Sequence, residues 1–155
     1  MATTPDNSGV RFPPPLVYIG GLVAGYLLER KYPLATLPRN FSLAAGIVLC
    51  VAGLVVIRSA ARSMWKARTS MIPFRPTTAI VCEGVFQLTR NPMYLGMVVI
   101  YVGIALLIRS PWALVLLPLV VLGVDRLVIA KEERYLAGKF GEPYLSYKSK
   151  VRRWI

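Results

Sequence analysis

Four apolar segments separated by polar links dominate the pattern of the sequence. They cover approximately Pro14–Leu28, Phe41–Ile57, Met93–Ile108 and Trp112–Ile129. Each is somewhat shorter than the roughly 20 residues that a straight membrane-spanning helix needs. Flanking Tyr, Trp and Arg side chains can extend such a helix to the membrane interface. The pattern therefore predicts an all-α integral membrane bundle of four transmembrane helices.

The links between these segments predict how the helices are connected. The stretch ERKYPLATLPRN joins the first two segments and RSP joins the last two, so each pair should form an antiparallel hairpin. We expect a single membrane domain over residues 1–155. Its parts would be a mobile N-terminal tail (1–13), a first helical hairpin (14–57), a cytoplasmic loop (58–92), a second hairpin (93–129) and a cytoplasmic C-terminal amphipathic helical segment (130–155).

Composition supports the membrane class and narrows the chemistry. The chain is 55% hydrophobic with a formal net charge of +12, and its mean hydropathy is +0.55. The basic residues alternate with apolar segments and form no basic, aromatic-studded face, which argues against nucleic acid as a partner. The sequence has no His, and Cys50 and Cys82 form no CxxC pair, so neither a metal site nor a disulfide is predicted.

The distribution of basic residues predicts the orientation in the membrane. Six Lys or Arg lie between Arg58 and Arg90 and seven between Lys131 and Arg153, against three in the first link and one in the RSP link. By the positive-inside rule, the middle loop, both termini and the C-terminal segment face the cytoplasm. We expect a multi-pass protein of the cell (inner) membrane, with its two longest polar segments on the cytoplasmic side.

The third apolar segment begins with the stretch TRNPMYLG. Asn91 is a good N-cap, and Pro92 is preorganised for the first helical position. The N-terminus of a helix attracts anions, and Arg90 adds a positive charge whose planar fork suits carboxylate or phosphate. This helix start is thus a candidate site, although Arg90 could instead only extend to lipid headgroups.

The fourth apolar segment ends among ionisable residues. Steps of seven place Asp125 with Glu132 and Arg126 with Glu133, so these side chains are expected to share one broad face. Ionisable groups at membrane depth usually face protein or a polar cavity. The alternative is an internal ion pair of Arg126 with Asp125 or Glu133 that only stabilises the bundle.

The C-terminal segment EERYLAGKFGEPYLSYKSKVRRWI shows helical spacing. Its apolar and aromatic positions recur mostly at steps of three or four, at Tyr135, Leu136, Phe140, Tyr144 and Tyr147. Gly141 and Pro143 interrupt the pattern, which predicts two short amphipathic helices on the cytoplasmic surface of the membrane. Such a surface anchor explains the basic residues but not the paired glutamates at the membrane boundary.

Two motifs together are recognisable. The stretch EGVFQLTRNPMYLG, then an apolar hairpin, then EERYLAGKFGEPYLSYKSKVRRW resembles the membrane methyltransferase family that includes isoprenylcysteine carboxyl methyltransferases and phospholipid N-methyltransferases. The resemblance covers about Thr77–Trp154. It implies transfer of a methyl group from S-adenosyl-L-methionine to a lipophilic or small membrane-delivered acceptor, which could be an isoprenylcysteine-type carboxylate, a phospholipid amine or a thiol.

The resemblance also implies roles for individual residues. It places the cofactor at the cytoplasmic boundary, among Ile80, Val81, Phe86, Asn91, Pro92, Met93, Tyr94 and Glu132. It places Arg126 towards the acceptor, and it makes Glu132, Glu133 and Arg90 the candidate catalytic residues. Either glutamate could accept a proton from an amine acceptor. Asn91 stands where the family often has His, so proton transfer cannot depend on that position.

A function of another class is also compatible with the pattern. A small four-helix membrane transporter or interaction protein could use Arg126 and the glutamates to bind an ion without any cofactor. Against it, the charged residues lie at the ends of the apolar segments, whereas transporter sites usually lie near the middle of the bilayer.

Overall fold

The computed structural model describes residues 7–10, 12–72 and 75–155, and the elements in this part of the chain are all helical. The prediction of an all-α protein is therefore confirmed. The elements are α1 (Pro15–Lys31), α2 (Arg39–Lys66), the 3-10 helix η1 (Gly84–Gln87), α3 (Pro92–Leu107), α4 (Pro111–Val124), the π-helical turn η2 (Asp125–Ile129), α5 (Ala130–Phe140) and α6 (Glu142–Lys150).

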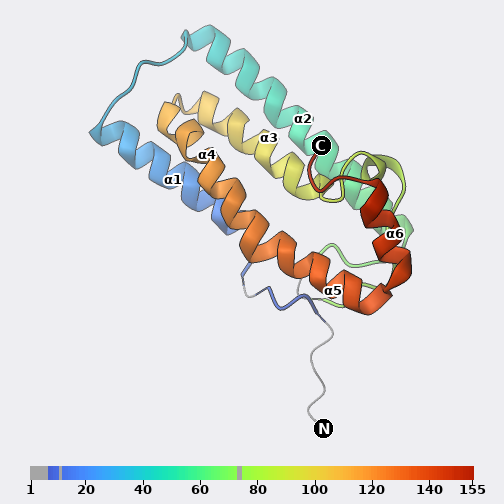
Figure 1. Ribbon diagram of the computed structural model, residues 1–155. Helices are drawn as coiled ribbons and strands as arrows, with labels where there is room; N and C mark the ends of the chain where they lie inside the picture. Colours follow the sequence, from blue (N-terminus) through green and yellow to red (C-terminus); the bar gives the residue numbers. More distant parts are fainter. Residues whose placement is uncertain (1–6, 11, 73–74) are drawn as a thin grey trace.

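The helices of the second predicted hairpin, α3 and α4, contact each other, but those of the first do not pair. Helix α2 packs along α3, and α1 packs along α4, while the main contacts include no pairing of α1 with α2. Figure 1 shows α1 and α2 on different sides of the bundle, joined by a long link at one end. The prediction that the first two helices pack against each other is wrong. The link between them is long enough for each helix to pack against a different neighbour.

Glycines explain the close packing of α2 on α3. Gly46 and Gly53 lie seven residues apart on α2, and Gly96 and Gly103 have the same spacing on α3. A Cβ atom on Gly53 would lie 2.6 Å from the carbonyl oxygen of Gly96, and one on Gly103 would lie 2.8 Å from that of Gly46. We call these four residues the glycine seam. Small residues at matched positions let two helix backbones touch, as is common between membrane helices.

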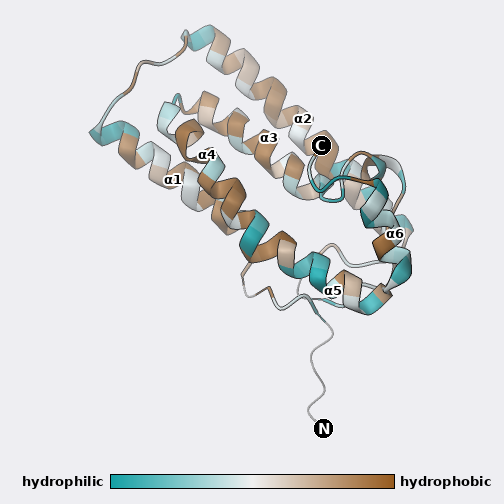
Figure 2. Ribbon diagram, viewed as in Figure 1, coloured by the Kyte–Doolittle hydropathy of each residue, from teal (hydrophilic) through white to brown (hydrophobic). Residues whose placement is uncertain are grey.

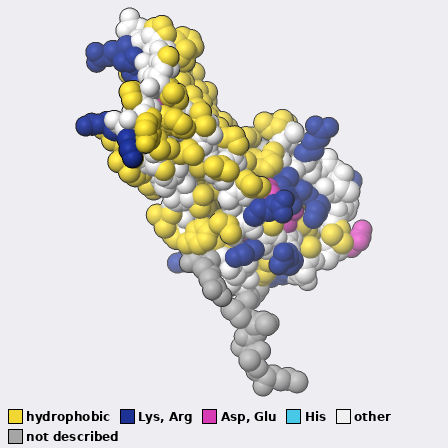
Figure 3. Space-filling model, turned by 60° about the vertical axis from the view of Figure 1, so that its left-hand side comes forward, with side chains coloured by type: hydrophobic (Ala, Val, Ile, Leu, Met, Phe, Trp, Pro, Cys, Tyr) yellow, Lys and Arg dark blue, Asp and Glu magenta, His cyan; other side chains and the backbone are white. Residues whose placement is uncertain are grey.

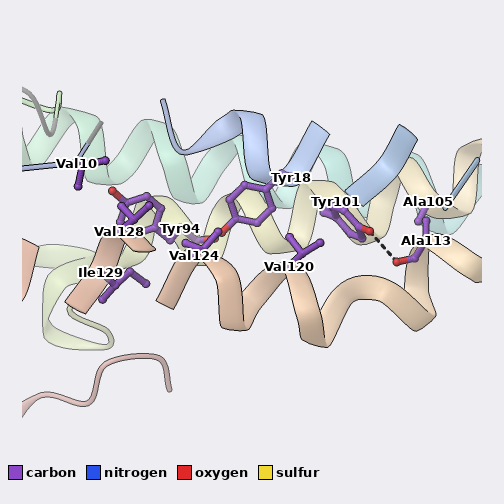
Figure 4. Packing of buried hydrophobic residues seen from close by; sticks show 10 residues of the cluster. All are labelled: Val10, Tyr18, Tyr94, Tyr101, Ala105, Ala113, Val120, Val124, Val128 and Ile129. Carbon is purple, nitrogen blue, oxygen red and sulfur yellow. Dashed lines mark hydrogen bonds between the residues drawn. The ribbon is translucent and has the colours of Figure 1, made fainter. Parts of the chain in front are cut away.

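The buried core lies between α1, α3 and the helix that begins at α4. Tyrosines organise it: the Tyr101 hydroxyl donates to the carbonyl oxygen of Ala113 at 2.8 Å, and the Tyr18 hydroxyl donates to that of Tyr94 at 3.2 Å. Figure 4 shows these rings among aliphatic side chains, with Val120 and Val124 on the α4 side. Each buried hydroxyl has an acceptor, so the aromatic rings fill the core without leaving a polar atom unpaired.

Large apolar side chains cover much of the outer surface. On α2 they include Leu43, Ile47, Val48, Val51, Leu54 and Val55, all exposed. Figure 2 shows apolar residues along the four long helices and polar ones at their ends, and Figure 3 shows the same apolar surface in a space-filling view. A soluble protein rarely exposes so continuous an apolar surface.

Two helices in the described part of the chain are long and apolar enough to cross a membrane. They are α2 and the continuous helix Pro111–Phe140, which joins α4, η2 and α5. Helix α1 has 17 residues and α3 has 16, so α3 is about 24 Å long at 1.5 Å per residue. By length, the structure therefore supports two of the four predicted spans.

Three boundaries differ from the predicted ones. Helix α2 continues to Lys66, so residues 58–66 are helical although a loop was expected there. Val10 is buried in the core cluster, whereas a mobile tail was expected over residues 1–13, of which 1–6 and 11 lie outside the described residues. The helix of the second predicted hairpin (93–129) does not end near Ile129 but continues through the charged residues of α5 to Phe140.

Candidate active site

A cavity of about 330 Å³ opens at the end of the bundle where α3 begins. Its walls come from the start of α1, the end of α2 and the loop after it, η1, the start of α3, and helices α5 and α6. Eight of its lining residues are the ones that the family resemblance implied for the cofactor: Ile80, Val81, Phe86, Asn91, Pro92, Met93, Tyr94 and Glu132. Segments far apart in the sequence thus meet at one cavity.

The cavity also has walls that the sequence did not assign to it. On the side of α2 and the following loop, Met64, Met71 and Ile72 line the cavity. From α5 and α6, Tyr135, Leu136, Tyr144 and Tyr147 also line it. These four belong to the apolar pattern that was interpreted as a membrane-surface face. Their helical spacing was visible in the sequence, but only the fold turns this face towards α3.

Helix α5 contributes a polar contact to the cavity. The Tyr94 hydroxyl donates a hydrogen bond of 2.7 Å to Oε1 of Glu132. Tyr94 is buried and Glu132 is half-buried, and both line the cavity. The bond links α3 to α5 and fixes the orientation of this carboxylate. The cavity therefore presents this carboxylate among walls that are mostly apolar and aromatic.

The neighbouring Glu133 has a different environment. Both of its oxygens bind Arg153, with Nε to Oε1 at 3.0 Å and Nη2 to Oε2 at 2.7 Å. Nη2 of Arg90 lies 3.0 Å from Oε1, and Nζ of Lys148 lies 3.5 Å from Oε2. Nη1 of Arg153 also donates to both oxygens of Asp125, at 3.1 and 3.0 Å. We call these five residues the Arg153 cluster.

The cluster ties the segment after α6 to the bundle. The Glu133 side chain is only 6% exposed, so its charge depends on the cations around it. The hydrogen bonds from Arg153 to Glu133 raise the pKa of this arginine above its usual value, which keeps it charged. This role could not be predicted from the sequence, because Arg153 is one of several basic residues in a charged segment.

The ion pairs differ from the predicted ones because of η2. A π-helical turn adds one residue to the helix, so residues eight apart, not seven, come to one face. Asp125 and Glu133 both reach Arg153 in this way, whereas Arg126 is exposed and lies outside the cavity lining. The expected shared face of Arg126 and Glu133 is therefore wrong, and so is an Arg126 partner as the explanation for these carboxylates.

The start of α3 is as predicted in position but not in its cap. The helix begins at Pro92 with Asn91 at the N-cap, yet no side chain caps the first turn. The Asn91 amide instead donates to the carbonyl oxygen of Arg153 at 3.0 Å. The predicted N-cap hydrogen bond is therefore wrong, because the segment after α6 competes for the asparagine.

Two tyrosines of α6, Tyr144 and Tyr147, also line the cavity. Burial raises the pKa of Tyr144 to about 12 and also raises that of Tyr147. The Tyr147 hydroxyl donates to the carbonyl oxygen of Phe86 at 2.6 Å, which joins α6 to η1. Both phenols are therefore protonated near neutral pH and can act as hydrogen-bond donors.

Most of the residues that line the cavity lie within a region that matches a known protein family. Residues 41–143 match the model of the phospholipid methyltransferase family, which is more than half of the chain. The chain belongs to the phospholipid methyltransferase family. The resemblance drawn from the two motifs is thus confirmed. The family region runs from α2 to the first turn of α6 and so includes η1, the start of α3 and the paired glutamates.

Individual relatives agree with the family. Protein-S-isoprenylcysteine O-methyltransferases B and A of Arabidopsis thaliana are 28% and 27% identical to this chain over 108 residues, or 68% of the chain. The match covers 55% of each plant protein, so the chain aligns with about half of their length. An uncharacterized protein of Haemophilus influenzae is 38% identical over 63 residues, which is 41% of this chain and all of that protein. No solved structure gives a significant match.

Proposed function

We propose that this protein is a membrane-embedded methyltransferase that uses S-adenosyl-L-methionine and methylates a lipophilic or small membrane-delivered acceptor. The observation that carries the proposal is the cavity: the eight residues that the family resemblance assigns to the cofactor come from separate segments and line this one cavity. Family membership supports methyl transfer as the reaction class.

The residues around the cavity suit this cofactor chemically. A volume of about 330 Å³ lies within the range of roughly 300–1,000 Å³ that small-molecule sites occupy. The apolar and aromatic walls suit an adenine ring, and the Glu132 carboxylate suits a cationic ligand. The uncapped first turn of α3 suits a carboxylate. The described residues hold no group of three or more metal-ligating side chains, and the proposal needs none.

The chain's own residues then perform positioning and solvent exclusion. When bound, S-adenosylmethionine supplies an activated methyl group on its sulfonium sulfur. Methyl transfer is an in-line displacement, so alignment of the acceptor and exclusion of water matter more than acid catalysis. Apolar side chains that line the cavity, among them Ile80, Phe86 and Leu136, would limit the water around a bound cofactor. Tyr94 holds Glu132 in place, and we assign Glu132 as the proton acceptor when the nucleophile is an amine.

We assign Glu133 and Arg90 to the support of this site. Both oxygens of Glu133 are held by cations, which leaves this carboxylate poorly suited to accept a proton. Arg90 bonds Glu133 and the carbonyl oxygen of Lys148, and it lines the cavity beside Asn91. Arg126 is exposed and lies six residues before Glu132, and we keep it as a candidate contact for the acceptor outside the cavity.

The test of the cofactor is binding and turnover by the purified protein. Calorimetry in detergent with S-adenosylmethionine should give a saturable heat for the wild type, and Glu132→Gln and Tyr94→Ala should weaken binding. Transfer of a labelled methyl group to total membrane lipids or to a thiol panel should then identify the acceptor. A wild type that binds no cofactor but moves protons across proteoliposomes would replace this proposal with the transporter alternative.

We further propose that all four long helices cross the cell (inner) membrane, with the cavity on the cytoplasmic side. The larger number of Lys and Arg residues in the segments around the cavity end supports this orientation. Figure 3 shows a group of these side chains there and another at the opposite end of the bundle. Cys82 is exposed near this end, and an impermeant maleimide should label it in inverted vesicles but not in intact cells. Burial and the neighbouring Glu83 raise the pKa of Cys82, so labelling is best done at about pH 8.5. Labelling in intact cells would show that Cys82 faces outward and would contradict the proposed orientation.

A further inference from the structure

The first turn of α3 is left open although a capping residue stands beside it. A side-chain oxygen at the N-cap normally accepts from the N–H groups of the second or third helical residue, which here are Met93 and Tyr94. Asn91 makes no such bond and donates to the carbonyl oxygen of Arg153 instead. Asn91, Met93 and Tyr94 all line the cavity. A ligand anion can therefore take the place that the asparagine leaves open.

A second observation points to the same ligand. Nε of Arg90 is buried and has no hydrogen-bond partner among the described residues, and the side chain is 9% exposed. Its other two nitrogens are engaged, Nη2 with Glu133 and Nη1 with the carbonyl oxygen of Lys148 at 3.3 Å. Arg90 also lines the cavity. A buried donor without an acceptor is costly, and this one lies one residue before the uncapped helix.

Residues 151–154, which we call the tail strap, hold this arrangement in place. The Arg90 amide donates to the carbonyl oxygen of Arg152 at 3.0 Å, and the Thr89 hydroxyl donates to that of Arg153 at 2.9 Å. On its other side the strap is bound to Glu133 and Asp125 through the Arg153 guanidinium. The strap therefore joins the start of α3 to the helix that carries the glutamates.

We propose that Arg153 is a positioning residue that keeps Asn91 from capping α3, so that the helix start and Arg90 stay open to the carboxylate of the cofactor. The proposal rests on the proposed function and adds the device that maintains its anion subsite. Arg153 itself does not line the cavity. Without its ion pairs the strap loosens, and the side-chain oxygen of Asn91 becomes free to accept from Met93 or Tyr94. It would then compete with the ligand carboxylate.

Two probes separate this effect from a general loss of binding. S-adenosylhomocysteine carries the amino-acid carboxylate, whereas 5′-methylthioadenosine shares the adenosine and thioether but lacks the carboxylate and the ammonium group. Calorimetry on the wild-type full chain in detergent should give a lower Kd for S-adenosylhomocysteine than for 5′-methylthioadenosine. Arg153→Gln should raise that Kd about tenfold and leave the Kd of 5′-methylthioadenosine within about twofold.

The Asn91→Ala background tests whether Asn91 transmits the effect. Alanine has no oxygen with which to cap α3, so adding Arg153→Gln to Asn91→Ala should change the ratio of the two Kd values by less than about twofold. A purely structural role of Arg153 would weaken both probes in both backgrounds. An equal loss of S-adenosylhomocysteine affinity in the two backgrounds overturns the inference.

A variant at the capping position keeps the test decisive if Arg153→Gln does not fold. Asn91→Asp cannot donate to the Arg153 carbonyl and is a strong cap, so it should weaken S-adenosylhomocysteine about tenfold and leave 5′-methylthioadenosine within about twofold. An unchanged ratio of the two Kd values contradicts the inference and leaves the proposed function standing. A wild type that binds neither probe overturns both.

Discussion

The glycine seam and the Arg153 cluster both act on α3, one along its length and one at its start, and they use different physics. At the seam, backbones touch because Gly53 and Gly96 carry no side chains. At the cluster, a nearly buried carboxylate is balanced by cations from three segments. The seam tolerates no added volume, whereas the cluster tolerates no unbalanced charge. Substitutions at the two places should therefore fail for different reasons.

The largest effect is expected at the seam. In Gly53→Val, the new Cβ would lie 2.6 Å from the Gly96 carbonyl oxygen and from Cγ1 of Ile100. Because a backbone atom cannot move aside, we expect a loss of about 3 kcal/mol in unfolding free energy. Thermal unfolding in detergent measures it. Gly20→Ala is the control, since a Cβ there meets nothing within 4 Å, and an equal loss in both would contradict a packing seam.

A smaller effect is expected at the cluster. Glu133→Gln leaves Arg90 without its carboxylate partner and leaves Arg153 paired with Asp125 alone in the described part of the chain. This should cost about 2 kcal/mol, less than for a fully buried pair because Arg153 is 33% exposed. Denaturant unfolding should show this loss. Glu142→Gln changes an exposed carboxylate in the first turn of α6 and should alter stability by less than about 0.5 kcal/mol. Equal stabilities would remove the structural role of Glu133.

Glu132 is directly before Glu133 in the chain, so the two glutamates can be compared at neighbouring positions. In Glu132→Gln the new side-chain oxygen can still accept from the Tyr94 hydroxyl, so stability should change by less than about 1 kcal/mol. Cofactor affinity should fall about tenfold, because the substitution removes the cavity carboxylate that is not paired with a cation among the described residues. Calorimetry and unfolding on the same sample measure both. If Glu132→Gln instead lowers stability and leaves cofactor affinity unchanged, Glu132 supports the structure and is not the residue that contacts the cofactor.

The smallest effect is expected at Arg126. Its side chain is exposed and lies outside the cavity lining, so Arg126→Gln should leave both the melting temperature and cofactor affinity unchanged. If Arg126 contacts the acceptor, the KM for the acceptor lipid should rise about threefold, which corresponds to the loss of one exposed ion pair. Arg62→Gln, at another exposed arginine on α2, is the control. Equal KM values in all three proteins would remove Arg126 from the site.

Local patterns predicted the helices and several of their ends. Asn91 and Pro92 correctly marked the start of α3, and Gly141 correctly marked the break between α5 and α6. These features depend on the conformational preferences of residues close together in the chain, namely a fixed φ angle in proline and a tolerated positive φ in glycine. The end of α2 was placed too early because a helix that leaves an apolar layer need not stop there.

The contacts between distant segments were decided only by the tertiary structure. The sequence determined the all-helical class, the family motifs and the residues around the candidate cofactor site. It could not reveal that η2 adds a residue, so that Glu133 pairs with Arg153 and Glu132 with Tyr94, although both glutamates line the cavity. Nor could it show that the side-chain amide of Asn91 donates a hydrogen bond to the carbonyl oxygen of Arg153. Each outcome is a competition between a local partner and one brought from far along the chain, and only the folded arrangement determines which partner is within reach.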